Sequence, residues 1–223
     1  MSYFVTGTDT GVGKTLIACA LLRGLAAQGR RIAGFKPVAA GCDVGGCNDD
    51  AKALLAAGTV PLRYEQVNPY CLHDAIAPHI AARNENTFIG IPRILAAYHA
   101  LSAQAEVVVV EGAGGFRVPF NETQDSADLA QEMGLPVILV VGMRLGCLNH
   151  ALLTGEAIAA RGLALAGWVA NVVDEDMAAL QENIDTLRQR IAAPLLGVVP
   201  YMEVPDAGRV AACLDLKLLE PAE

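Results

Sequence analysis

One short stretch near the start of the chain, residues 4–17 ("FVTGTDTGVGKTLI"), restricts the fold more than any other feature of the sequence. Apolar residues lead into a loop with three glycines, and a segment of helical period follows that loop. Such a loop turns backbone N–H groups inward, and the positive end of the helix dipole adds to their attraction for anions. The stretch therefore predicts a strand, a loop and a helix arranged around a phosphate site.

The loop departs by one position from the usual phosphate-binding pattern, G-x-x-x-x-G-K-S/T. The pattern needs glycine where this chain has Thr8, and the chain places its glycine one residue earlier, at Gly7. We interpret the stretch as an enlarged phosphate loop, in which Lys14 reaches the β- and γ-phosphates and the Thr15 hydroxyl ligates Mg²⁺. A glycine-rich turn that only caps a helix is the alternative, but the flanking strand and the long amphipathic helix favour phosphate binding.

The rest of the chain alternates strand-like and helix-like segments. The predicted strands are residues 3–6, 31–36, 106–111, 136–141, 165–171 and 195–199. Several are continuously apolar, as in "VVVV", which is typical of strands buried on both faces of a parallel sheet. The predicted helices are residues 14–28, 50–57, 92–104, 126–133, 149–161 and 177–191. We therefore predict a single P-loop α/β domain over residues 1–223, with a doubly wound, mainly parallel sheet flanked by helices, of the P-loop NTPase type.

Composition limits the class of partner. Hydrophobic residues make up 53% of the 223 residues and charged residues 18%, which excludes a disordered chain and allows a full core. A net charge of −8 argues against a general affinity for nucleic acid or for anionic membranes. No apolar run approaches the roughly 20 residues of a membrane span, and no signal-peptide pattern opens the chain. We expect a soluble, cytoplasmic protein.

The cysteines form no recognisable motif. No CxxC occurs among them; they are Cys19, Cys42, Cys47, Cys71, Cys147 and Cys213. Only "GCDVGGC", which holds Cys42 and Cys47, has a spacing that suggests metal or redox chemistry. Because the cytosol keeps thiols reduced, we interpret these two as free loop thiols.

Charged residues end two of the predicted strands. Glu111 ends "VVVVE" and is followed by "GAGG", at the sheet edge where open α/β folds bind ligands. For Glu111 we favour a role in metal binding over the alternative, an exposed side chain at the turn that ends the strand. Lys36 ends the second strand and would stabilise charge on a transferred phosphoryl group, although most lysines are simply solvated. Asp49 and Asp50 open a helix, and either a capping role or a place in a Mg²⁺ shell fits them.

Several segments together resemble the dethiobiotin synthetase family. They are "VTGTDTGVGKT", "KPV", "NPY" followed by "APH", "VEGAGG", "LPVILVVG", "LGCLNH", "GWVAN" and "LLGVVP". They occur in the family's order over most of the chain, and "VEGAGG" together with "LGCLNH" is specific. The resemblance implies an ATP-dependent cyclo-ligase of biotin synthesis. Its substrates would be 7,8-diaminopelargonate and CO₂ or bicarbonate, and the reaction would pass through a carbamate and a carbamic–phosphoric mixed anhydride with Mg²⁺.

The resemblance also implies roles for individual residues. The catalytic positions would be Lys36, Lys14 and Thr10, and the metal positions Thr15, Asp50 and Glu111. The ATP-binding positions would be Gly11, Val12, Gly13, Lys14, Thr15, Leu16, Asp50, Glu111, Gly112, Ala113, Gly114, Asn171, Pro200, Tyr201 and Met202. The substrate positions would be Ala40, Gly115, Gly146, Cys147 and Asn149, the last three supplied across a twofold homodimer. For Cys147, a small buried apolar role fits equally well.

Two positions depart from the family. Many members have Ser where this chain has Ala40, and some have Glu where it has Gly11. Both changes remove polar contacts to the diamine, so the affinity for substrate is expected to differ or to be restored elsewhere. The phosphate and metal positions are intact.

A positioning or partitioning ATPase of the same superfamily is the main alternative. Such switch proteins usually carry a second lysine near the start of the loop and a basic or amphipathic surface for a membrane or DNA target. Here no lysine precedes Lys14, and the C-terminal "AACLDLKLLEPAE" is short and acidic. Synthetases of the superfamily that carry a glutaminase domain are a nearer alternative, but this chain has no room for that domain.

Overall fold

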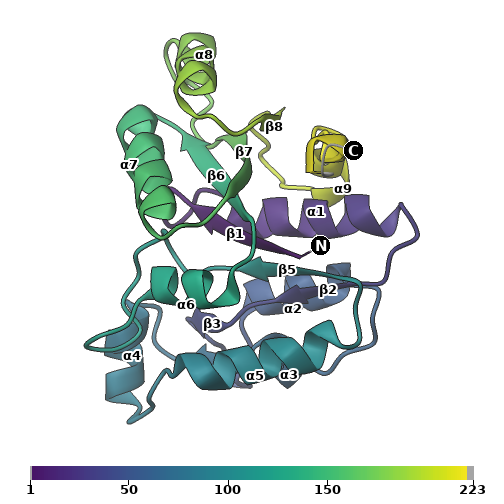
Figure 1. Ribbon diagram of the computed structural model, residues 1–223, viewed down its shortest axis with the longest axis vertical. Coiled ribbons are helices and arrows are strands. Elements are labelled where there is room, and N and C mark those ends of the chain that lie inside the picture. Colours follow the sequence, from purple (N-terminus) through teal and green to yellow (C-terminus); the bar gives the residue numbers. More distant parts are fainter. Residues whose placement is uncertain (1, 220–223) are drawn as a thin grey trace.

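A six-stranded parallel sheet forms the centre of the protein in the computed structural model, which describes residues 2–219 (Figure 1). Its strands are β1 (Tyr3–Gly7), β2 (Ile32–Phe35), β5 (Val107–Glu111), β6 (Val137–Met143), β7 (Leu165–Val172) and β8 (Leu195–Val199). They lie in the order β2-β5-β1-β6-β7-β8, and every neighbouring pair is parallel. The chain first winds to one side of β1 and, from β6 onward, to the other, so the predicted doubly wound sheet is confirmed.

Helices cover both faces of the sheet. They are α1 (Lys14–Ala26), α2 (Asp49–Ala57), α3 (Tyr64–Val67), α4 (Pro78–Asn84), α5 (Ile91–Ser102), α6 (Ser126–Met133), α7 (Cys147–Ala160), α8 (Leu180–Arg190), α9 (Ala207–Ala211) and a 3₁₀ turn at Leu216–Leu219. Among these described helices none is long and apolar enough to cross a membrane. Short polar side chains begin three of them: Asn48 accepts backbone N–H groups at the start of α2, Asp125 does so for α6, and Asp206 accepts one for α9.

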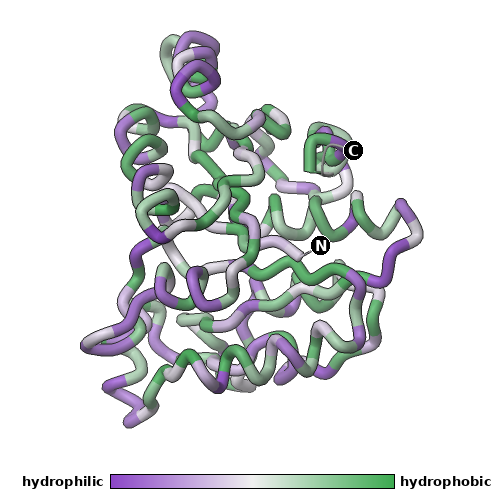
Figure 2. The backbone as a smooth tube through the Cα atoms, in the orientation of Figure 1, coloured by the Kyte–Doolittle hydropathy of each residue, from purple (hydrophilic) through white to green (hydrophobic). Residues whose placement is uncertain are grey.

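The alternation of side chains along each strand divides the core into layers. Val107 and Val109 of β5 pack with α1 and α2, whereas Val108 and Val110 pack with α4, α5 and α6 on the opposite face. Further along that second face, α7 and α8 cover β6 and β7 around the fully buried Trp168. Figure 2 shows the hydrophobic colour concentrated along the central strands. Burial on both faces explains the continuous apolar runs of the sequence.

The predicted strands and helices are all present, with shifts at their ends. The helix predicted at residues 149–161 begins earlier, at Cys147, because Gly146 adopts a left-handed conformation with φ 93° and starts it. The helix predicted at residues 177–191 is shorter, Leu180–Arg190. Gly29, Gly134 and Gly162 all have positive φ after their helices, the conformation in which glycine commonly ends a helix.

The sequence pattern missed a second, two-stranded sheet. It consists of β3 (Val38–Ala40) and β4 (Tyr70–Leu72), which pair in parallel. Strands of three residues are too short to show a period, so the pattern carries no signal for them. This small sheet extends the chain beyond the end of β2 and forms one wall of the cavity described below.

Candidate functional site

The loop between β1 and α1 holds its shape through glycines. Gly11 and Gly13 have φ of 73° and 89°, a conformation that costs a residue with a side chain free energy. Space is also restricted at Gly13, since an added Cβ would lie 2.3 Å from Nδ2 of Asn171. That amide, at the end of β7, donates a 2.8 Å hydrogen bond to the Val12 carbonyl. Asn171 therefore holds the loop in place through the Val12 carbonyl.

Lys14 lies buried under this loop. Its Nζ donates a 2.9 Å hydrogen bond to the Asp9 carbonyl, and the side chain forms no ion pair within the described residues. Burial, helped by the nearby Lys36 ammonium, lowers the pKa of Lys14 to about 8. A buried cation that lacks a carboxylate partner is suited to an incoming anion.

Lys36, just beyond β2, is held in a different way. Its Nζ lies 2.6 Å from Oε1 of Glu111 and 3.0 Å from Oδ2 of Asp50. Burial works to lower the pKa of Lys36, but the two carboxylates outweigh it and raise that pKa above its ordinary value. Burial likewise works to raise the pKa of Asp50, and the Lys36 ammonium outweighs it, so that pKa is lowered. Lys36 and Asp50 therefore stay charged around neutral pH.

Glu111 links this ion cluster to the phosphate loop. The carboxylate is completely buried, and its Oε1 also accepts a 2.8 Å hydrogen bond from the Thr15 hydroxyl at the start of α1. Its other oxygen, Oε2, is buried and has no hydrogen-bond partner among the described residues. A buried carboxylate oxygen without a partner, beside a threonine hydroxyl, offers the oxygen ligands that a hard cation prefers.

The sheet order brings these groups together. β2 and β5 are neighbours and β5 pairs with β1, so Lys36, Glu111 and the phosphate loop meet at the carboxyl edge of three adjacent strands. Parallel α/β folds bind ligands at this edge, where the winding of the chain reverses.

A cavity of about 620 Å³ opens beside the cluster. Of the residues predicted from the sequence, its lining contains Thr10, Lys36, Ala40, Asp50, Ala113, Gly114 and Gly115. Its other walls come from β3, from the start of α4 and from the segment after β5, including Arg117. It combines apolar walls with the charged residues Asp9, Lys36, Asp50 and Arg117, as expected for a carbon chain that carries reactive polar groups.

Other predicted residues lie away from this cavity within one chain. Gly146, Cys147 and Asn149 form the first turn of α7 and do not line it. Cys147 is 2% exposed, and burial raises the pKa of its thiol. The segment of Pro200, Tyr201 and Met202 follows β8, and Met202 packs against the core on the α1 side, as Leu16 does. The roles of both groups remain predictions.

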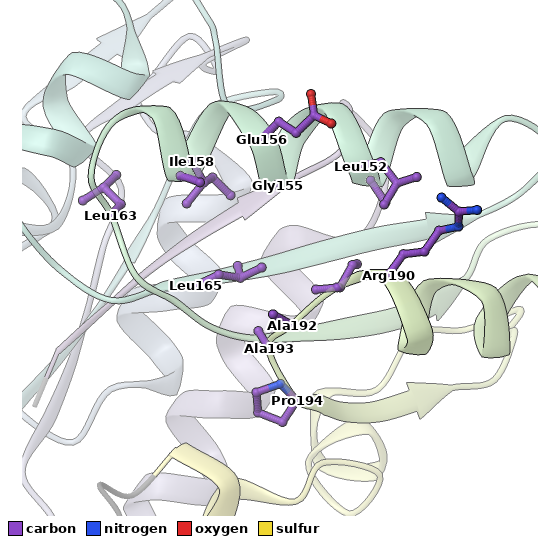
Figure 3. Close-up of a pocket in the computed structure, with 13 residues that line it drawn as sticks. Leu152, Gly155, Glu156, Ile158, Leu163, Leu165, Arg190, Ala192, Ala193 and Pro194 are labelled. Atoms are coloured by element: carbon purple, nitrogen blue, oxygen red, sulfur yellow. The ribbon is translucent and has the colours of Figure 1, made fainter.

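A different cavity, of about 540 Å³, lies between α7 and the end of α8 (Figure 3). Apolar side chains such as Leu152, Ile158 and Leu165 line most of it, with Glu156 and Arg190 as its charged residues. It contains neither a glycine-rich loop nor a cluster of buried charges. The candidate active site is therefore the cavity beside Lys36.

Comparison with known proteins assigns the chain to a family. Residues 1–208 match the family model described as an AAA domain. An ATP-dependent dethiobiotin synthetase BioD from Aromatoleum aromaticum is 56% identical over 218 residues, which cover 96% of this chain and 97% of the relative. The chain belongs to the dethiobiotin synthetase family. A BioD from Cellvibrio japonicus is 54% identical, with 96% of each chain covered.

Solved structures resemble the chain in fold alone. In the MinC:MinD cell division protein complex of Aquifex aeolicus, one chain is 14% identical with a TM-score of 0.58, over 93% of this chain and 85% of that one. That degree of identity shows a shared P-loop fold and says nothing of a shared activity. The synthetase family resemblance seen in the sequence is confirmed, and the positioning-ATPase alternative rests on the fold only.

Sequence patterns missed several residues that build this synthetase-family site. Asn68 donates a 2.6 Å hydrogen bond to the Lys36 carbonyl and so fixes the backbone that carries the lysine. Asn48 caps α2 just before Asp50 and also donates to the Ala40 carbonyl at 3.3 Å. "NPY" marked the surroundings of Asn68, but only the fold shows its contact with Lys36.

The interpretation of Cys42 as a free loop thiol was wrong. Cys42 and Cys71 form a disulfide, with Cα atoms 6.0 Å apart and a sequence separation of 29. The pairing of β3 with β4 brings the two cysteines together. Local sequence patterns do not predict this strand pairing. Cys47 is a free thiol, as predicted.

Proposed function

We propose that the protein catalyses ATP-dependent formation of the cyclic urea of dethiobiotin from 7,8-diaminopelargonate and CO₂. The observation that carries the proposal is the Lys36–Glu111–Asp50 cluster beside the phosphate loop, in a chain that is 56% identical to a dethiobiotin synthetase. The cavity beside the cluster is the proposed place of the diamine.

The proposed reaction has three steps. One amine of the diamine attacks CO₂ and loses a proton, which gives a carbamate. A carbamate oxygen then attacks the γ-phosphate of ATP, ADP leaves, and a carbamic–phosphoric mixed anhydride forms. The second amine attacks the carbonyl carbon, phosphate leaves with the former carbamate oxygen, and loss of a proton completes the ring.

The chain contributes positioning and charge to these steps. Phosphoryl transfer spreads negative charge over oxygens, and buried cations stabilise that charge most where water is excluded. Lys14 and the N–H groups at the start of α1 face the nucleotide phosphates, and Lys36 faces the group that is transferred. Thr10 and the backbone of residues 113–115, which line the cavity, complete the wall between nucleotide and diamine.

Magnesium fits the residues present. Thr15, Asp50 and Glu111 would hold it, and the buried, unpaired Oε2 of Glu111 supports a cation there. Within the described residues no group of three or more His, Cys, Asp or Glu has the arrangement of a complete metal site. Mg²⁺ commonly takes one or two carboxylates and completes its shell with phosphate oxygens and water. When bound, it supplies positive charge to the phosphates.

The proposal includes a homodimer in the cytoplasm. Gly146, Cys147 and Asn149 do not reach the cavity of their own chain, and a second copy would bring its α7 N-terminus to the substrate carboxylate. Gly146 gives α7 no side-chain cap. The Cys147 N–H donates to the Arg144 carbonyl at 3.0 Å, so an anion would be bound by the N–H groups that follow it in the first turn.

Phosphate release from Mg-ATP, with and without 7,8-diaminopelargonate and bicarbonate, tests the proposal when the organic product is identified by mass. Release that requires both co-substrates and yields a cyclic urea supports it. Slow release that ignores the diamine would reject it and favour a switch ATPase.

A further inference from the structure

Three cysteines gather beside the active site without a part in the proposed reaction. The Cys42–Cys71 disulfide joins the end of β3 to β4, and the free Cys47 follows five residues after Cys42. Cys47 and Cys71 both line a cavity of about 390 Å³, which is separate from the substrate cavity. Cys42 is only 7% exposed, so reagents in solution meet Cys47 and Cys71 first.

The surroundings of Cys71 favour thiol exchange. The Tyr64 hydroxyl lies 3.3 Å from Sγ of Cys71 and donates to Oδ1 of Asn68 at 2.9 Å; turned away from Asn68, it would donate a hydrogen bond to a thiolate released at Cys71. Arg93 lines the same cavity and stacks over the Tyr70 ring at 4.6 Å. Its positive charge stabilises thiolates and attracts small anionic thiols.

The segment that carries Cys47 is a tight but adaptable turn. The backbone N–H groups of Asp43 and Cys47 donate to the Cys47 carbonyl and the Asp43 carboxylate, at 2.8 and 2.9 Å. Two glycines, Gly45 and Gly46, lie inside the turn, and both line the cavity. Glycines permit the backbone rearrangement that would bring the Cys47 sulfur to Cys71.

We propose that these cysteines form a thiol–disulfide relay, with Cys47 as the exchange thiol that closes or opens the Cys42–Cys71 bond. The external reactant is a small anionic thiol or its disulfide, bound in the cavity of Cys47, Cys71 and Arg93. Cytosolic disulfides are usually transient and redox-sensing, so such a bond in a cytoplasmic enzyme points to regulation.

Closing the bond takes three exchanges. The Cys47 thiolate attacks one sulfur of the small disulfide, forms a mixed disulfide and releases one small thiolate. The Cys71 thiolate attacks the Cys47 sulfur and releases the second small thiolate. The Cys42 thiolate attacks the Cys71 sulfur and restores Cys47 as a thiolate. Two protein thiols thus lose two electrons and two protons, and the small disulfide becomes two thiols.

The disulfide is connected to the catalytic cluster through Asn48. Asn48 donates its backbone N–H to the Tyr64 hydroxyl at 2.7 Å and its side-chain amide to the carbonyls of Ala40 and Gly41, next to Cys42. Its Oδ1 accepts the backbone N–H of Asp50 at 3.1 Å, and the Asp50 carboxylate contacts Lys36. Opening the disulfide leaves the segment after β3 held to β4 by hydrogen bonds alone and weakens the placement of Asp50, so nucleotide binding should respond to the redox state.

The first test counts and follows thiols in the full-length protein. After oxidation with glutathione disulfide, denaturation and alkylation with maleimide, intact mass should show four modified cysteines, and six after prior reduction. Starting from reduced protein, formation of the Cys42–Cys71 bond should be about tenfold slower in Cys47→Ser than in wild type. Cys213→Ser, which removes another partly buried free thiol, should leave the rate unchanged.

Two further measurements make the relay falsifiable. Cys42→Ser should trap a Cys47–Cys71 disulfide that peptide mass mapping identifies, and a non-hydrolysable ATP analogue should bind several-fold more weakly to reduced than to oxidised wild type. A Cys47→Ser rate equal to wild type, or a Cys42→Ser protein without that disulfide, would overturn the relay. Equal nucleotide affinity in both redox states would overturn its link to the site. None of these measurements depends on the diamine reaction.

Discussion

The phosphate loop and the carboxyl ends of β2 and β5 each bury a lysine in the same crevice, and the two lysines are held in opposite ways. Lys14, under the loop, donates to the Asp9 carbonyl, and burial lowers its pKa to about 8. Lys36, at the strand ends, lies between the carboxylates of Glu111 and Asp50, which raise its pKa.

The difference separates two functions of buried positive charge. An ammonium without a counter-ion costs free energy until an anion arrives, so Lys14 provides affinity for phosphate. A paired ammonium is already stabilised and stays in place, so Lys36 provides a fixed charge for the reacting group. We therefore expect changes at Lys14 to alter binding, and changes at Lys36 to alter turnover.

The largest expected effect is on turnover in Lys36→Ala. Diamine-dependent phosphate release should fall about a thousandfold because the charge that faces the transferred group is lost. The dissociation constant for ATP should stay nearly unchanged, since Lys14 and the loop remain. Steady-state kinetics and nucleotide titration measure the two effects, and near-normal turnover would remove Lys36 from the catalytic role.

Stability should fall in Glu111→Gln. The substitution removes the closest counter-ion of the buried Lys36 and should lower the free energy of unfolding by about 2–4 kcal/mol. Glu106→Gln is a matched control just before the same strand, where the carboxylate is exposed and pairs with Arg31 at 3.5 Å. Urea unfolding should show little change there, and equal losses in both variants would contradict the assignment of a buried ion cluster.

A smaller effect is expected from the pH dependence of nucleotide affinity. A bound phosphate raises the pKa of Lys14, so above pH 8 the complex holds more protons than the free protein. Affinity should therefore be full below pH 8 and fall with a limiting slope of about tenfold per pH unit above it. Calorimetric titration from pH 7 to 9.5 would measure the slope. In Lys14→Arg the positive charge persists at these pH values, so the nucleotide affinity should not change between pH 7 and 9.5.

The smallest effect is expected at Ala40, which lines the cavity together with Thr10 and Lys36. Ala40→Ser restores the hydroxyl common in the family and should lower the KM for the diamine about two- to tenfold. The KM for ATP serves as the internal control and should not move. An unchanged KM for the diamine would mean that this chain makes the lost contact elsewhere.

Local patterns predicted the parts of this fold that depend on contiguous residues. The run "VVVVEGAGG" predicted both the buried strand β5 and the position of Glu111. A continuous apolar run is typical of a strand buried on both faces of a parallel sheet, and a carboxylate at its end lies at the edge where such sheets bind ligands. The phosphate loop was recognised from its glycines, and two of them, Gly11 and Gly13, have positive φ in the structure. Helix ends were less well predicted and differ from the predicted ends by one to three residues.

The sequence by itself determined the α/β class, the phosphate loop and the set of charged strand ends, because each is encoded in neighbouring residues. Tertiary structure alone decided which groups touch. The pairing of Lys36 with Glu111 depends on β2 lying beside β5, and the Cys42–Cys71 disulfide depends on the short β3–β4 sheet. Such contacts join residues 29 and 75 positions apart, and packing of the whole chain selects among the many possible pairings.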